Sequence, residues 1–152
     1  GEYIFLSDQD DTWLPNKVSV CVDAPKSNDM IVHNMEIVNE KGNSLETNLY
    51  HQRIKRQNLW MIGGTYYGCT LAFRAKWLKI ILPFPNNLAL HDFWISYIIE
   101  KRGKTIYEIE PLMRYRYSDN SVSHKVDNSL FYKVIYRIEI VISIIKRLFW
   151  DK

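Results

Sequence analysis

The sequence is poor in cysteine, glycine and proline, and these shortages exclude several classes of protein. Two cysteines among 152 residues are too few for a disulfide scaffold, and six glycines and five prolines are too few for a collagen-like chain. Because 47% of the residues are hydrophobic, a disordered chain is also excluded. The composition therefore indicates one globular domain with a sizeable core.

The chain also lacks a strong charge of one sign and a long apolar run. Its 20 Lys and Arg against 17 Asp and Glu leave a net charge of +3, and the basic excess lies in the last 24 residues, so we expect no nucleic-acid partner. No apolar run approaches the ~20 residues that span a bilayer. Cys21 and Cys69 have no CxxC spacing and no signal peptide precedes them, so we expect reduced thiols and a cytoplasmic protein.

Apolar runs and helical periods predict an α/β fold. Strand-like runs alternate with segments that follow a proline or a capping residue and end before a proline or glycine. We expect strands at 3–6, 30–38, 69–73 and 105–109, and helices at about 15–24, 74–82 and 93–102. The polar stretch 44–62, with a basic cluster at Arg53, Lys55 and Arg56, fits a helix and a ligand-covering segment equally well.

The tail has a strong helical period, which predicts an amphipathic basic helix at 129–152 after a domain at 1–128. Ile140 and Ile144 fall on its polar side. The apolar stripe consists of Phe131, Ile135, Ile138, Ile142, Ile145 and Phe149. Such a helix packs on the domain or lies on an anionic membrane surface, and both interpretations stay open.

Three carboxylates, those of Asp8, Asp10 and Asp11, follow the first expected strand. Like charges this close cost on the order of 1 kcal/mol each even in water, and a cation would reverse that cost. Asp8 and Asp10 alternate in an extended segment and therefore point the same way, an arrangement that suits Mg²⁺ or Mn²⁺ beside a substrate diphosphate. The alternative is a solvated turn in which Asp11 caps the next helix.

Asp92 is a second candidate for chemistry because His91, Phe93 and Trp94 surround it in the sequence. A partly desolvated carboxylate there can act as a general base toward a hydroxyl, although a helix N-cap is an equally ordinary role.

Two arginines, Arg114 and Arg116, follow the strand expected at 105–109, where a guanidinium can hold a phosphate or form a surface ion pair. Three histidines have no metal-ligand spacing and are expected to be structural or exposed: His33, His51 and His124.

Five segments occur in a fixed order between residue 1 and about residue 123. They are Tyr3-Ile4-Phe5-Leu6-Ser7-Asp8-Gln9-Asp10-Asp11-Thr12-Trp13-Leu14-Pro15-Asn16-Lys17, Gly68-Cys69-Thr70-Leu71-Ala72-Phe73-Arg74, Leu82-Pro83-Phe84-Pro85, His91-Asp92-Phe93-Trp94-Ile95, and Glu110-Pro111-Leu112 with Tyr115-Arg116. Together they resemble bacterial family 2 glycosyltransferases, especially the rhamnosyltransferase-like enzymes of surface-polysaccharide synthesis. The resemblance implies a partial GT-A (Rossmann-like) α/β domain that transfers a sugar from a nucleotide-sugar donor with inversion.

The resemblance also implies roles for single residues. Asp8 and Asp10 match the DxD motif that holds a divalent cation on the donor diphosphate, and Asp92 matches the base that takes the proton from the acceptor hydroxyl. Arg116 matches an arginine near the diphosphate. The walls of the donor-sugar and acceptor pockets are expected from Trp13, Gly68, Cys69, Thr70, His91 and Trp94.

The chain departs from the family pattern in two places. A histidine that often follows the Tyr-Arg pair is Ser118 here, with Asp119 next to it. The family's nucleotide-binding half would precede Gly1, so we expect this chain to be the later part of a larger domain. The expected function is sugar transfer to a polysaccharide or lipid-linked acceptor at the inner face of the plasma membrane. The alternative is a non-catalytic remnant, or a module that binds carbohydrate or membrane.

Overall fold

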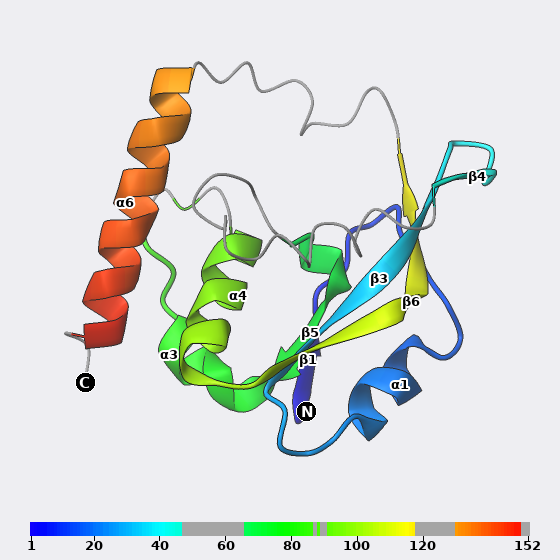
Figure 1. Ribbon diagram of the computed structural model, residues 1–152, viewed down its shortest axis with the longest axis horizontal. Coiled ribbons are helices and arrows are strands. Elements are labelled where there is room, and N and C mark those ends of the chain that lie inside the picture. Colours follow the sequence, from blue (N-terminus) through cyan, green and yellow to red (C-terminus); the bar gives the residue numbers. More distant parts are fainter. Residues whose placement is uncertain (47–65, 87, 89–90, 118–129, 150–152) are drawn as a thin grey trace.

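The fold is a mixed sheet with helices on both faces, which confirms the α/β class. The computed structural model describes residues 1–46, 66–86, 88, 91–117 and 130–149, and in the last helix the side chains of residues 138–147 (Figure 1). Several residues discussed above lie outside the described residues: Arg53, Lys55, Arg56, His51, His124, Ser118 and Asp119.

The sheet has the strand order β1-β5-β3-β6-β2, and β4 pairs with β3. Its strands are β1 (Tyr3–Phe5), β2 (Thr12–Trp13), β3 (Met30–Val38), β4 (Ser44–Glu46), β5 (Leu71–Arg74) and β6 (Thr105–Arg116). The two long central strands, β3 and β6, are parallel, and the other pairs are antiparallel. The predicted strand at 30–38 is confirmed at both ends.

The helices lie where the sequence predicts them, but their lengths agree less well with the prediction. They are α1 (Lys17–Asp23), the 3₁₀ turns η2 (Gly68–Thr70) and η3 (Ala75–Trp77), α3 (Leu78–Ile81), α4 (His91–Arg102) and α6 (Leu130–Phe149). The helix expected at 74–82 is therefore a 3₁₀ turn followed by a short helix. Helix α4 begins at His91, so Asp92 lies in its first turn instead of preceding the helix.

Alternation along the strands builds a core on each face of the sheet. On one face Met30 and Val32 belong to a buried cluster that includes Ile98 of α4. The residue between them, Ile31, belongs to a second cluster with Cys21 of α1. Figure 1 shows α1 and α4 on opposite sides of the strands.

Strand β6 runs to Arg116, past the end at 109 that the sequence predicts. A proline interrupts a strand pattern because it cannot donate a ladder hydrogen bond. Here the register between β3 and β6 shifts beside Pro111, and the side chain of Asn34 donates to the carbonyl of Ile109 at 2.9 Å. The irregular register accommodates Pro111, so β6 continues beyond the proline and Tyr115 lies within the strand.

Helix α6 packs on the domain through the side of the helix that the sequence analysis treated as polar. Ile140 and Ile144 are only 4% and 2% exposed. Of the predicted apolar stripe, Ile138, Ile142 and Ile145 point outward, with exposed fractions of 54%, 47% and 46%. The side chains of the other three members, Phe131, Ile135 and Phe149, lie outside the described part of the chain. Among the described helices, none combines the length and the hydropathy that crossing a membrane requires.

Arg147 explains which face of α6 docks. Its guanidinium donates to the carbonyls of Leu82 at 2.8 Å and Pro83 at 2.7 Å, and its Cζ lies 5.7 Å from the ring centroid of Trp94. Hydrogen bonds from a charged donor are stronger than neutral ones, so the contacts of Arg147 stabilise the docking of this face of α6 on the domain.

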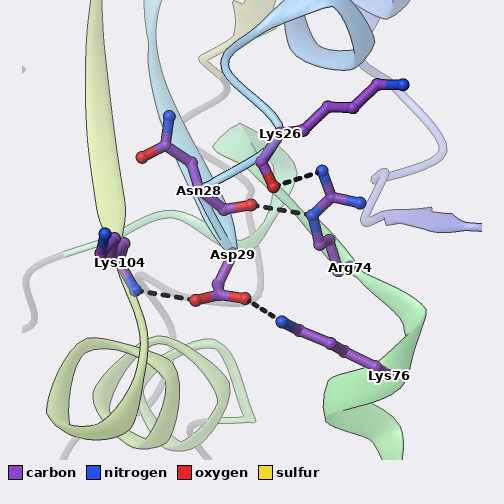
Figure 2. A network of polar contacts seen from close by, with 6 residues as sticks. All are labelled: Lys26, Asn28, Asp29, Arg74, Lys76 and Lys104. Carbon is purple, nitrogen blue, oxygen red and sulfur yellow. Dashed lines mark hydrogen bonds and ion pairs between the residues drawn. The ribbon is translucent and has the colours of Figure 1, made fainter.

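The end of the sheet where β3 and β6 begin is held by polar contacts around Asp29 (Figure 2). Its carboxylate forms an ion pair with Lys76 at 2.6 Å and accepts a hydrogen bond from the backbone N–H of Lys104 at 2.9 Å. Arg74 donates to the carbonyls of Lys26 and Asn28, both at 2.9 Å. Burial alone would raise the pKa of Asp29, but its donors bring that pKa below the ordinary value.

Candidate functional site

The opposite end of the sheet brings together three potential metal-ligand side chains. Strand β1 is antiparallel to β5, so the acidic segment that follows β1 meets the turn η2 that precedes β5. Asp8, Asp11 and Cys69 each offer one ligand atom, and these atoms lie within 4.8 Å of one another. We call these three residues the Asp8–Asp11–Cys69 cluster.

The cluster differs from the DxD pair that the sequence indicates. Residues 9–10 form a turn, so Asp8 and Asp10 do not lie in an extended segment. Asp10 is exposed and is not part of the cluster. Asp11 takes its place, and it does not cap the next helix as in the alternative interpretation, because α1 begins only after Asn16. The chain turns at 9–10, and the third carboxylate is therefore the one brought to the interior.

Asp11 carries a buried carboxylate that is poorly satisfied. Both of its oxygens are buried, and the thiol of Cys69 and the backbone of Asp8 are the polar groups beside them. Burial first, and then the charges of Asp8 and Asp10, raise the pKa of Asp11 to about 6, against the lowering effect of the Cys69 thiol and the backbone of Asp8. Burial and the neighbouring Asp11 also raise the pKa of Cys69. A bound cation would relieve both effects.

Asp92 lies next to η2, where Gly68 is its neighbour. A Cβ atom on Gly68 would lie 3.5 Å from the Cβ of Asp92, 3.6 Å from Nε2 of His91 and 3.7 Å from a methyl group of Leu6. Burial raises the pKa of Asp92, and the charge of Asp8 adds to that rise. The carboxylate accepts a hydrogen bond of 2.8 Å from the backbone N–H of Phe93.

Tyr115 is the β6 side chain that faces the cluster. Its ring lies 5.5 Å from that of Tyr67, and burial, with Tyr67, Cys69 and the acids of the cluster, raises its pKa to about 12. Alternation places Arg114 and Arg116 on the other face of β6, where Arg114 pairs with Glu36 at 2.9 Å. The structure thus places Arg116 on the opposite face of the strand from the cluster.

Three of the residues expected to line pockets have structural contacts instead. Trp94 is fully buried in the core and donates its indole N–H to the carbonyl of Ile81 at 3.0 Å. Thr70 is also fully buried and donates to the carbonyl of Tyr67 at 2.7 Å, which closes η2. Trp13 is half-buried and packs 5.6 Å from the ring of Phe5. Trp94 falls inward because α4 turns its side chain toward the sheet.

Sequence reasoning missed the contribution of Lys17. Its side chain is fully buried, and its ammonium donates to the carbonyl of Cys69 at 2.9 Å. Burial lowers the pKa of Lys17, opposed by Cys69, Cys21 and Asp11. The only sequence signal was the spacing of Lys17 and Cys21, which puts both on one face of α1.

No protein-family model and no curated protein matches this chain. Two carboxylates and a thiol offer a ligand set for a divalent cation, and a carboxylate of raised pKa can accept a proton beside it.

Proposed function

We propose that this chain is the metal-binding and acceptor-binding part of a GT-A type glycosyltransferase. It transfers a sugar, with inversion, from a nucleotide-sugar donor to a polysaccharide or lipid-linked acceptor at the inner face of the plasma membrane. The observation that carries the proposal is the meeting of the Asp8–Asp11–Cys69 cluster with Asp92 across Gly68.

The chemistry of the cluster supports the binding of a divalent cation. Asp11 holds two buried oxygens beside a further carboxylate and a thiol. Asp8 and Asp11 would hold Mg²⁺ or Mn²⁺, with Asp10 close enough to act on Asp11 by its charge. When bound, the ion would offset the charge that develops on the leaving diphosphate.

Asp92 supports the proton-transfer half of the reaction. It is the base that takes the proton of the acceptor hydroxyl as that oxygen attacks the anomeric carbon. Its raised pKa suits this task, because a base whose pKa lies nearer to the operating pH accepts a proton more effectively. The hydrogen bond from the N–H of Phe93 orients the carboxylate.

The first test measures Mn²⁺ binding by calorimetry, with and without UDP, GDP and dTDP. We expect saturable binding that a nucleoside diphosphate strengthens, and a loss of about tenfold or more in Asp11→Asn. Asp23→Asn is the matched control, because Asp23 is an exposed acid at the end of α1. Absence of binding by the folded wild type, or equal affinity of Asp11→Asn and the control, contradicts the proposal.

The second test separates the base from the cation site. We expect Asp92→Asn to bind Mn²⁺ and nucleoside diphosphate as the wild type does, and to lose product formation with a panel of nucleotide sugars. The expected loss is on the order of 10²–10⁴-fold, the contribution of a positioned general base. Weakened donor binding in Asp92→Asn would assign this residue to binding instead.

The outward face of α6 supports the membrane part of the proposal. Ile138, Ile142 and Ile145 form an exposed apolar row, and Lys146 beside them is exposed and basic. We expect Ile142→Asp to reduce sedimentation with phosphatidylglycerol vesicles, and Val22→Asp on α1 to leave it unchanged. Equal sedimentation of both variants, or loss of a dimer in Ile142→Asp, contradicts a lipid contact.

A further inference from the structure

Lys17 is a fully buried cation without an ion-pair partner among the carboxylates of the described residues. Removing an ammonium group from water costs several kcal/mol unless other contacts replace its hydration. A residue kept at such a cost points to a role for its contacts.

The contacts of Lys17 join three elements behind the candidate site. Its Nζ lies 2.9 Å from the carbonyl oxygen of Cys69, 3.9 Å from the sulfur of Met113 and 4.2 Å from the ring centroid of Trp13. A thioether and a ring face are weak partners for an ammonium group, so the carbonyl of Cys69 is the strong, directional one.

That carbonyl belongs to the turn that separates the two halves of the site. The thiol of Cys69 is part of the Asp8–Asp11–Cys69 cluster, and the preceding Gly68 lies against Asp92. Thr70 closes the turn on itself through Tyr67, whereas Lys17 ties the turn to α1.

We propose that Lys17 is a positioning residue for the cation site. Its ammonium holds the backbone of Cys69 from the interior, and this sets the spacing between the cluster and Asp92. The role rests on the proposed function, since it concerns the same site. Lys17 does not touch the cation or the substrate.

Lys17→Met separates this role from a contribution to stability alone. Methionine keeps an unbranched apolar chain and removes the ammonium group. Replacement of buried ions by apolar groups of similar volume is often neutral or stabilising. A melting temperature no lower than that of the wild type is therefore expected, together with weaker Mn²⁺ binding. Lys41→Met, at an exposed lysine, is the matched control.

Three measurements on the full chain test the proposal. We expect Lys17→Met to bind Mn²⁺ about tenfold more weakly than the wild type, because loss of a residue that orients a metal ligand typically lowers metal affinity by this amount. We expect the near-ultraviolet thiolate band of the Co²⁺-loaded protein to decrease. In the metal-free protein, amide exchange at 68–71 should accelerate about tenfold, because local opening becomes easier.

The outcomes distinguish this proposal from the proposed function. Absence of Mn²⁺ binding by the wild type contradicts the cation site, whereas unchanged amide exchange in Lys17→Met contradicts the positioning role. A stable Lys17→Met with wild-type Mn²⁺ affinity also overturns that role. If Lys17→Met does not fold, Lys17→Gln decides: its side chain stays polar but ends one bond short of the carbonyl of Cys69, so wild-type affinity and exchange in it overturn the proposal.

Discussion

The two ends of the sheet each bury an aspartate, and the two carboxylates have opposite pKa shifts. At the end drawn in Figure 2, Asp29 receives Lys76 and the backbone N–H of Lys104, and its pKa falls. At the other end Asp11 has the Cys69 thiol beside it and two acids nearby, and its pKa rises to about 6. The difference teaches that donors, rather than depth, decide whether a buried carboxylate stabilises this fold.

The glycines at the two ends show the same contrast. A Cβ on Gly103 would lie 2.6 Å from the ring of Trp77 and 2.8 Å from a carboxylate oxygen of Asp29. The nearest atom to a Cβ on Gly68 lies at 3.5 Å, an ordinary contact distance. The end of the sheet at Asp29 is therefore tightly packed around Gly103, whereas the end at Asp92 has space for a side-chain atom at Gly68.

The largest expected effect is that of Gly103→Ala. The added methyl group must displace Trp77 or Asp29, and we expect a loss of about 3 kcal/mol in the free energy of unfolding. Urea titration followed by circular dichroism measures it. Gly68→Ala is the control at the other end and should change stability by less than about 1 kcal/mol. Equal losses of stability in the two variants would show that the two ends of the sheet are packed equally tightly.

Asp29→Asn should give the next largest loss, about 2 kcal/mol at pH 7, because the ion pair with Lys76 is lost and the bond from Lys104 no longer ends on a charge. Since the folded-state pKa of Asp29 is lowered, its contribution is present above the ordinary carboxyl pKa and disappears as the pH falls below it. Wild type and variant should converge in stability toward pH 2. The exposed Asp23→Asn should match the wild type throughout.

Asp11→Asn is expected to act in the opposite direction. The folded-state pKa of Asp11 is raised from 3.8 to about 6, so the folded chain binds the proton more tightly and stability falls as the pH rises through this window. Removing the charge should stabilise the metal-free protein by about 1 kcal/mol at pH 8, after allowance for partial solvation. Thermal unfolding from pH 4 to 8 measures both effects. A destabilised Asp11→Asn would mean that the carboxylate is satisfied.

The smallest expected effect is that of Lys76→Met. The side chain of Lys76 is 64% exposed, and exposed ion pairs contribute about 0–1 kcal/mol. We expect the free energy of unfolding to fall by about 0.5 kcal/mol at low salt. High salt should remove this difference between the two proteins, because it screens the ion pair of the wild type. A loss as large as that of Asp29→Asn would show that Lys76, and not the N–H of Lys104, is the main donor.

The sequence predicted those parts of the fold in which local pattern and tertiary packing agree. The strand at Met30–Val38 is a mainly apolar segment rich in β-branched residues and bounded by turn residues, and its limits were right. The end of β6 was wrong because Pro111 breaks the local pattern, while Asn34, far away in sequence, makes the irregularity tolerable. For α6 the helical period was right, and the side chains that pack on the domain, Ile140 and Ile144, are the two that fall on its polar side.

The candidate site was predicted in outline and missed in detail. Sequence placed Asp8, Cys69 and Asp92 among the functional residues, and the structure brings them together. It chose Asp10 over Asp11, because an extended segment was assumed where the chain turns. Lys17 could not be predicted, since the carbonyl that it binds lies in another segment of the chain.

The strand order β1-β5-β3-β6-β2 also determines when during folding the site can form. No neighbours in that order follow one another in sequence, and the ladder between Thr12 and Arg114 joins nearly the two ends of the described sheet. Closing such long loops costs entropy before any pairing repays it, which makes folding slow. Asp8, Cys69, Asp92 and Tyr115 come from four separate stretches, so a fragment that lacks β6 should carry the acids without the site.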